Sequence, residues 1–117
     1  MYTNHELGKQ GENCACKFLE RKGYQIIQRN FSCKQGEIDI IAKDKEEYVF
    51  VEVKTRHSFH YGMPSEAVTY RKQKHLCHAT KYYLYLHKLE KVYVRFDIIE
   101  IIKRKEQFYF NHIKQVI

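Results

Sequence analysis

Two short apolar runs separated by a polar stretch constrain the fold of this chain most strongly. Residues 37–42 have the sequence EIDIIA, residues 48–54 have the sequence YVFVEVK, and the charged stretch KDKEE lies between them. β-Branched runs on either side of a polar turn predict a β-hairpin. If Asp44 pairs with Glu47 across the turn, Asp39 lies opposite Glu52 and Glu37 lies opposite Lys54.

This register sorts the hairpin by face, because successive side chains on a strand point to opposite sides. One face is wholly apolar and is predicted to be core: Ile38, Ile40, Ala42, Val49, Val51 and Val53. The other face gathers charged groups at one end: Glu37, Asp39, Glu52 and Lys54.

The charged end of the hairpin predicts a metal site. Asp39 and Glu52 repel each other as a directly opposed pair, which destabilises a sheet. A Mg²⁺ (or Mn²⁺) cofactor removes the conflict, since Mg²⁺ binds through one or two carboxylates, waters and substrate phosphates. Lys54 could then position the attacking water or stabilise charge on the phosphate. A solvent-exposed face in which Glu37 pairs with Lys54 is the alternative.

The rest of the chain predicts two helices and further strands. A helix over 3–22 begins with the capping box Thr3-x-x-Glu6 and ends at Gly23. Glu12 lies on its inward side, as a paired or metal-bound acid or as an edge residue reaching solvent. Strands over 25–30, 91–103 and 107–112 and a helix over 69–87 complete the order α-β-β-β-α-β-β. We expect one α/β (α+β) domain over 1–117, with a mixed β-sheet flanked by two helices.

The charge is uneven, with residues 61–117 holding eleven Lys or Arg against five Asp or Glu. Such a basic half favours nucleic acid as the partner. The helix over 69–87 would present its cations to phosphates, and residues after Lys54 would lie near the scissile bond; a solvated basic face is the alternative. The predicted nucleic-acid-binding residues are Arg56, His57, Arg71, Lys72, Lys74, His78 and Lys81.

A cytoplasmic location is expected. The first fifteen residues have no apolar core of a signal peptide, and no apolar run approaches the length that spans a bilayer. The four cysteines form no regular framework and are predicted to be reduced thiols.

The hairpin motif resembles that of a known family. Residues 36–42 (GEIDIIA) and 49–56 (VFVEVKTR) look like the signature of the YraN-like family of small bacterial proteins, uncharacterised protein family 0102. The likeness extends to Gly8-x-x-Gly11-Glu12-x-x-Ala15, to residues 66–68 with Lys72, and to residues 95–97. That family is similar to the PD-(D/E)xK nucleases and to archaeal Holliday-junction resolvases; Ile38 replaces the motif's proline.

The resemblance implies a restriction-endonuclease-like core and a DNA substrate, in preference to RNA. It also implies Asp39 and Glu52 as metal ligands, Lys54 as the catalytic lysine, Glu12 as a further acid at the metal, and a symmetric homodimer. We therefore expect a Mg²⁺-dependent endonuclease hydrolysing phosphodiester bonds, with branched DNA as a substrate. A catalytically silent nucleic-acid-binding module and a protein-interaction adaptor are the alternatives.

Overall fold

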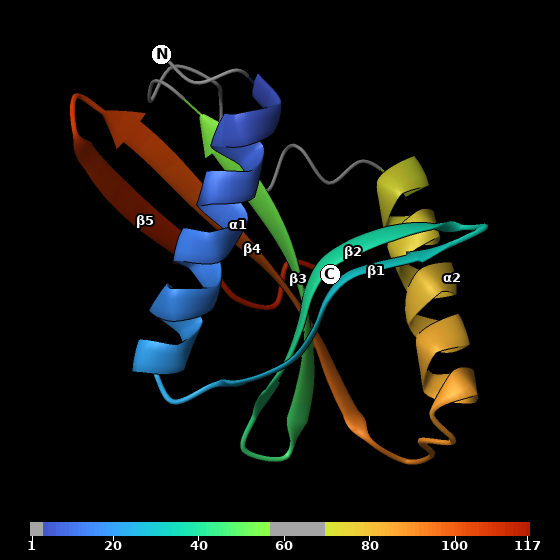
Figure 1. The fold of residues 1–117 in the computed structure, drawn as a ribbon. Helices are drawn as coiled ribbons and strands as arrows, with labels where there is room; N and C mark the ends of the chain where they lie inside the picture. The colour runs from blue at the N-terminus through green and yellow to red at the C-terminus, as the bar shows by residue number, and fades with distance from the viewer. Residues whose placement is uncertain (1–3, 57–69) are drawn as a thin grey trace.

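The computed structural model of the chain describes residues 4–56 and 70–117, and over these ranges it has the predicted element order and mixed sheet (Figure 1). The strands lie in the order β1-β2-β3-β4-β5; β3 and β4 are parallel and the other neighbours antiparallel. The elements are α1 (Asn4–Arg21), β1 (Gln25–Cys33), β2 (Gly36–Asp44), β3 (Glu47–Arg56), α2 (Tyr70–Leu86), β4 (Tyr93–Arg104) and β5 (Gln107–Ile113).

Both faces of the sheet are covered, one by each helix. On the α1 side, Leu19 packs in a cluster with Ile40 and Val51. On the α2 side, Tyr83 packs in a cluster with Ile41 and Phe50, which are 0% and 2% exposed. The predicted apolar face lies under α1, and the opposite face, which is charged at one end, is also core in the middle of the strands because α2 buries it there.

The helices end in the same type of backbone cap. After α1, the N–H groups of Gly23 and Tyr24 donate to the carbonyls of Glu20 and Leu19, each at 3.0 Å. This confirms the predicted left-handed turn at Gly23 (φ 91°). After α2, the N–H groups of Lys88 and Leu89 donate to Tyr85 and Leu84 at 3.2 and 2.9 Å. In the described part of the chain, neither helix combines the length and apolarity of a membrane span.

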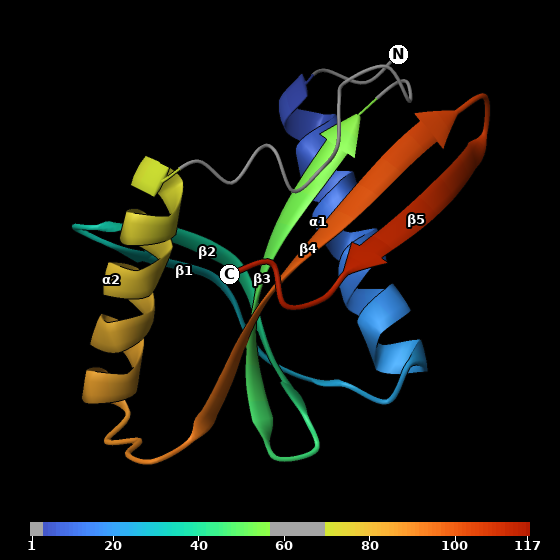
Figure 2. The same ribbon diagram turned by 180° about the vertical axis from the view of Figure 1, so that it is seen from behind.

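The β2–β3 hairpin has the predicted register only near its turn. Pairs run from Asp44–Glu47 to Ile40–Val51, and the ladder between these two strands ends there. The predicted cross-strand pairs Asp39–Glu52 and Glu37–Lys54 are therefore wrong. Beyond this point β1 and β2 bend toward α2, while β3 and β4 continue alongside α1 (Figure 2).

The bend has a packing cause that alternation alone does not show. Ile40 belongs to the cluster under α1, but Ile38, two residues earlier, belongs to the cluster under α2 with Leu76. A regular strand would place both isoleucines on one face. The strand therefore twists sharply between them, and Asp39 lies at the twist. We call this opening between β2 and β3 the fork.

The other end of the hairpin is clamped by a buried arginine. Arg95 on β4 donates to Asp97 (2.9 Å), and its Nη1 reaches both Asp44 and Glu47, each at 3.2 Å, at the hairpin turn. Its Nη2 donates to the Tyr24 hydroxyl just after α1. The guanidinium thus ties the hairpin turn to β4 and to the segment that follows α1, at the opposite end of the hairpin from the fork.

Gly11 sets the distance between α1 and the fork. A Cβ atom on Gly11 would overlap the Thr55 hydroxyl and would lie 3.3 Å from Thr55 Cβ. The close neighbour of Gly11 is thus the Thr55 side chain of β3. At Gly8, by contrast, no described atom lies within 4 Å of the added carbon.

Gly11→Ala should therefore destabilise the protein by about 1–3 kcal/mol, the usual cost of overpacking. Because the clash involves the Thr55 side chain, adding Thr55→Ala should recover most of the loss. Urea unfolding of the two single variants and the double variant measures the coupling. Gly8→Ala is the control and should stabilise α1, since Ala is the better helix former; additive effects of Gly11→Ala and Thr55→Ala would contradict the close contact.

Candidate functional site

The carboxylate of Asp39 occupies the fork. Its Oδ2 accepts a hydrogen bond from the Val53 N–H at 2.8 Å, where a backbone carbonyl of β2 would have accepted had the ladder continued. Burial, together with the carboxylates of Glu12 and Glu52, raises the pKa of Asp39 to about 6 against the hydrogen bond from Val53. Asp39 is thus a desolvated acid with other acids close enough to act on it.

Glu52 is the second acid of the fork, and its two oxygens have different surroundings. Its side chain is 13% exposed, and Oε1 pairs with Lys54 Nζ at 3.3 Å and with Lys72 Nζ. Oε2 is buried and has no hydrogen-bond partner in the described part of the chain. A buried carboxylate oxygen without a donor is costly, and a cation is one way to satisfy it.

Two lysines from different elements share Glu52. Burial lowers the pKa of Lys54, but the neighbouring groups, among them Glu52 and Asp39, outweigh this, and its pKa lies above the ordinary value. Burial lowers the pKa of Lys72, and the Lys54 ammonium acts in the same direction. β3 and the first turn of α2 therefore deliver one cation each to the same carboxylate.

Glu12 approaches the fork from α1. Its carboxylate lies 3.8 Å from Arg29 Nη2, and its side chain is 21% exposed. Its charge contributes to the raised pKa of Asp39. Glu12 is therefore paired with Arg29 and partly open to solvent, and its carboxylate is close enough to Asp39 to influence the pKa of that residue.

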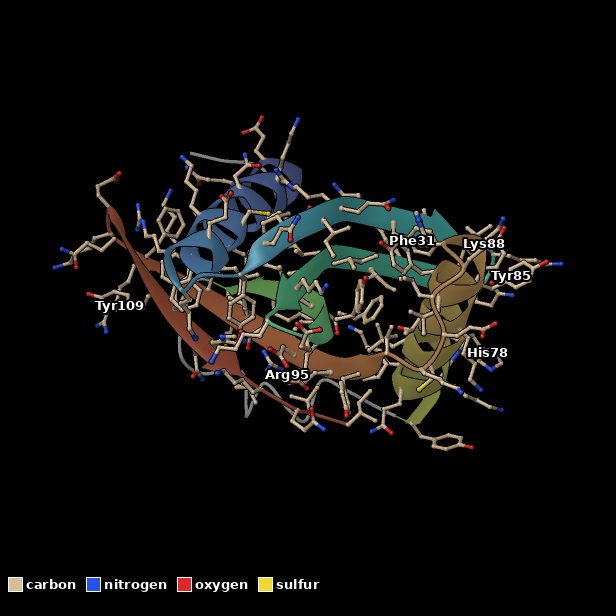
Figure 3. The ribbon with its side chains drawn as sticks, turned by 90° about the horizontal axis from the view of Figure 1, so that it is seen from below. Phe31, His78, Tyr85, Lys88, Arg95 and Tyr109 are labelled. Atoms are coloured by element: carbon tan, nitrogen blue, oxygen red, sulfur yellow. The ribbon has the colours of Figure 1, made fainter. Side chains whose placement is uncertain are left out.

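The predicted nucleic-acid-binding residues separate into three groups. Lys72 turns inward to Glu52, and Arg56 Nε lies 2.9 Å from Glu100 Oε2, so both belong to the fork. His57 lies outside the described residues. The others are exposed along α2, on the surface where Figure 3 places His78: Arg71, Lys74, His78 and Lys81.

Glu100 is a site residue that the sequence reasoning missed. It is in register with Lys54 on the neighbouring parallel strand, it is 6% exposed, and it pairs with Arg56. The signal was present, because Glu100 interrupts the otherwise apolar run of residues 98–102 (IIEII), where an acid needs a partner. Arg29, the partner of Glu12, carried no comparable signal.

The donors at the fork fit a hard divalent cation. Within residues 4–56 and 70–117, no three His, Cys, Asp or Glu side chains form a closed metal-binding group. The fork instead offers the unpartnered Oε2 of Glu52 and the desolvated carboxyl of Asp39. One or two carboxylates with open positions for water and phosphate are what Mg²⁺ uses at phosphoryl sites. The four cysteines form no disulfide, as predicted.

The pKa of Asp39 predicts how stability changes with pH. The folded value of about 6 exceeds the ordinary 3.8, so between these values the folded state binds more protons than the unfolded state. The stability contributed by protonated Asp39 is complete below pH 3.8 and is lost as the pH rises through about 6. Asp39→Asn should thus stabilise the protein at pH 7.5 by on the order of 2 kcal/mol and have little effect at pH 4.

Urea unfolding without divalent cations at the two pH values measures this difference. Glu46→Gln, which changes an exposed acid in the turn between β2 and β3, is the control and should change stability equally at both pH values. The interpretation of Asp39 fails if Asp39→Asn gives the same difference at pH 4 and pH 7.5.

Comparison with known proteins identifies the family. The model of uncharacterised protein family UPF0102 matches residues 11–101, a range that includes Glu12, Asp39, Glu52, Lys54, Lys72 and Glu100. A UPF0102 protein of Clostridium botulinum (strain Hall) is 50% identical over 102 residues, covering 86% of this chain and 83% of that protein. A UPF0102 protein of Caldicellulosiruptor saccharolyticus is 50% identical over 99 residues, covering 85% and 84%. The chain therefore belongs to uncharacterised protein family UPF0102.

Proposed function

We propose that this protein is a Mg²⁺-dependent (or Mn²⁺-dependent) endonuclease that hydrolyses phosphodiester bonds in the cytoplasm. DNA is its substrate in preference to RNA, and branched DNA is the first substrate to test. The observation that carries the proposal is the buried Oε2 of Glu52, which has no partner among residues 4–56 and 70–117, together with the desolvated Asp39 whose pKa Glu52 helps to raise. Acids so placed destabilise a protein unless a cation joins them.

Each residue of the fork has a role in this proposal. Asp39 and Glu52 hold the cation, with Glu12 as an outer ligand. A bound divalent cation supplies a Lewis acid at the phosphate and a lowered pKa for water. Lys54, kept protonated by Glu52 and Asp39, donates to the attacking water or to the phosphate oxygens where negative charge develops.

The pairs around the fork keep these groups in place. The Val53 N–H fixes the orientation of the Asp39 carboxylate. The Arg56–Glu100 pair fills the neighbouring position on β3 and β4, so that Lys54 has one carboxylate, Glu52, as its ion-pair partner among the described residues. Lys72 partly neutralises Glu52 until the cation is bound.

The exposed cations of α2 are proposed to bind the phosphate backbone. Arg71, Lys74, His78 and Lys81 lie on the helix whose first turn reaches Glu52. Binding through such contacts should weaken with salt, with a log–log slope of about −0.9 per duplex phosphate contacted. A symmetric homodimer would present two forks to two strands.

Cleavage tests the proposal directly. Purified protein with Mg²⁺ or Mn²⁺ should cut branched or single-stranded DNA, and EDTA should stop the reaction. Asp39→Asn and Lys54→Ala should each lower the rate at least about 100-fold, since they remove a ligand or a charge-stabilising donor. Lys105→Ala, in the exposed turn between β4 and β5, is the control and should retain the full rate.

The outcome also separates the alternatives. Salt-sensitive binding of DNA without cleavage of any substrate would make the protein a silent nucleic-acid-binding module. A lack of binding even at low salt would favour the adaptor and overturn the proposal.

Metal affinity tests the role of Glu52 without relying on activity. The Lys72 ammonium and a cation compete for Glu52, so Lys72→Met should bind Mn²⁺ several-fold more tightly in calorimetry or EPR titrations. Glu52→Gln should bind it at least about tenfold more weakly. Lys74→Met, an exposed cation two residues along α2, is the control; equal affinities for Lys72→Met and the native protein would contradict competition at Glu52.

A further inference from the structure

A hollow of about 470 Å³ lies at the carboxyl end of α2. It is lined by Lys81, Leu84, Tyr85, Lys88, Leu89 and Glu90. Its size is within the range of small-ligand sites. The cap of α2 builds it, because the Leu89 N–H donates to the Leu84 carbonyl at 2.9 Å and thereby holds the two leucines together. The hollow thus combines an apolar floor, a tyrosine and two cations.

The exposed ring of Tyr85 can stack on a planar group such as a nucleic-acid base. Its side chain is 77% exposed, and Figure 3 shows it pointing outward from α2 next to Lys88. A large exposed aromatic side chain beside cations is the arrangement on which bases of single-stranded nucleic acid stack. The lysines would meet the phosphates on either side of the stacked base.

The charge of α2 selects an anionic partner. The helix carries four Lys or Arg residues and no Asp or Glu, and Glu90 is the sole acid among the described residues that line the hollow. The first turn of the same helix reaches the fork through Lys72. At 1.5 Å per residue, Tyr85 lies about 20 Å along the axis from Lys72, which corresponds to roughly six nucleotides of a stacked strand.

A second hollow provides a comparison within the same molecule. It lies at the turn between β4 and β5 and is lined by Arg104, Lys105, Glu106, Gln107 and Tyr109. It has a tyrosine and cations but no leucine or other aliphatic floor. Figure 3 places Tyr109 at the opposite edge of the molecule from Tyr85. β4 runs from Glu100, at the fork, to Arg104 in this second hollow, so the absence of aliphatic side chains among its described lining residues is what distinguishes it from the first.

Resting on the nuclease function proposed above, we propose that the α2 hollow binds an unpaired base of the strand that leaves the fork. The base stacks on Tyr85 over Leu84 and Leu89, and Lys81 and Lys88 pair with the adjacent phosphates. The substrate class is therefore DNA with a single-stranded segment about six nucleotides from the scissile bond. Fully paired DNA cannot fill the hollow.

Binding of fluorescein-labelled oligo(dT) of 4 to 16 nucleotides, measured by anisotropy in EDTA, tests this proposal without cleavage. Native affinity should rise steeply up to a length of about six nucleotides. Tyr85→Ala should weaken binding of the longer oligonucleotides about tenfold, as expected for the loss of one stacked base. Tyr109→Ala is the matched control and should bind as the native protein does.

A second variant, Lys88→Gly, distinguishes a loss of oligonucleotide binding from a loss of stability. Lys88 has φ 53°, a left-handed conformation that glycine adopts at no steric cost. This variant should melt no lower than the native protein and yet bind the longer oligonucleotides several-fold more weakly. Unchanged binding by Tyr85→Ala, or an equal loss in Tyr109→Ala, overturns the proposal.

Failure of the hollow and failure of the nuclease can be told apart. If the native protein cuts with Mg²⁺ and Tyr85→Ala binds and cuts as it does, the hollow proposal is wrong and the nuclease stands. If no substrate is cut but binding still depends on Tyr85, the hollow stands and the nuclease proposal is wrong.

Discussion

The hydrogen bond from the Val53 N–H to Asp39 is the contact on which the candidate site depends. β2 cannot remain paired with β3 beyond Ile40, because Ile38 turns to pack under α2. The exposed N–H of β3 must then find another acceptor, since an unsatisfied backbone donor is costly. Asp39 supplies that acceptor, and in doing so its carboxyl is held inside the fork with a raised pKa. The same hydrogen bond therefore satisfies the backbone of β3 and holds Asp39 where the proposed metal site requires it.

The two ends of the β2–β3 hairpin differ in how completely their charged groups are paired. At the closed end of the hairpin, Arg95 satisfies acids on three elements, and Asp97 also accepts from His112 and from the Gln115 N–H. At the fork each acid has a partner, but both lysines pair with Oε1 of Glu52, and its Oε2 is left without a hydrogen-bond partner among the described residues. Buried ion pairs that are complete make a rigid support, whereas an incomplete one costs stability and invites a ligand. This contrast is the physical reason for assigning function to the fork.

Much of the fold was predictable, because it rests on local rules. The register beside the Asp44–Glu47 turn, the end of α1 at Gly23 and the element order all follow from turn chemistry and periodicity. The fork was not predictable, since the side on which Ile38 packs is decided by α2, a distant element. For the same reason the sequence predicted Lys72 as a nucleic-acid-binding residue but not as a partner of Glu52. Both outcomes depend on how α2 packs against the sheet, and no local sequence pattern encodes that packing.

A Mn²⁺ titration followed by amide NMR tests the central claim, that the fork holds a divalent cation, most directly. Paramagnetic broadening falls steeply with distance, so the amides nearest the ion should lose intensity first. If the fork holds the ion, Asp39, Glu52 and Val53 should broaden at the lowest Mn²⁺ concentration, and Glu52→Gln should abolish this pattern. Broadening that begins elsewhere, for instance at the histidines of α2, or that is unchanged in Glu52→Gln, would contradict it.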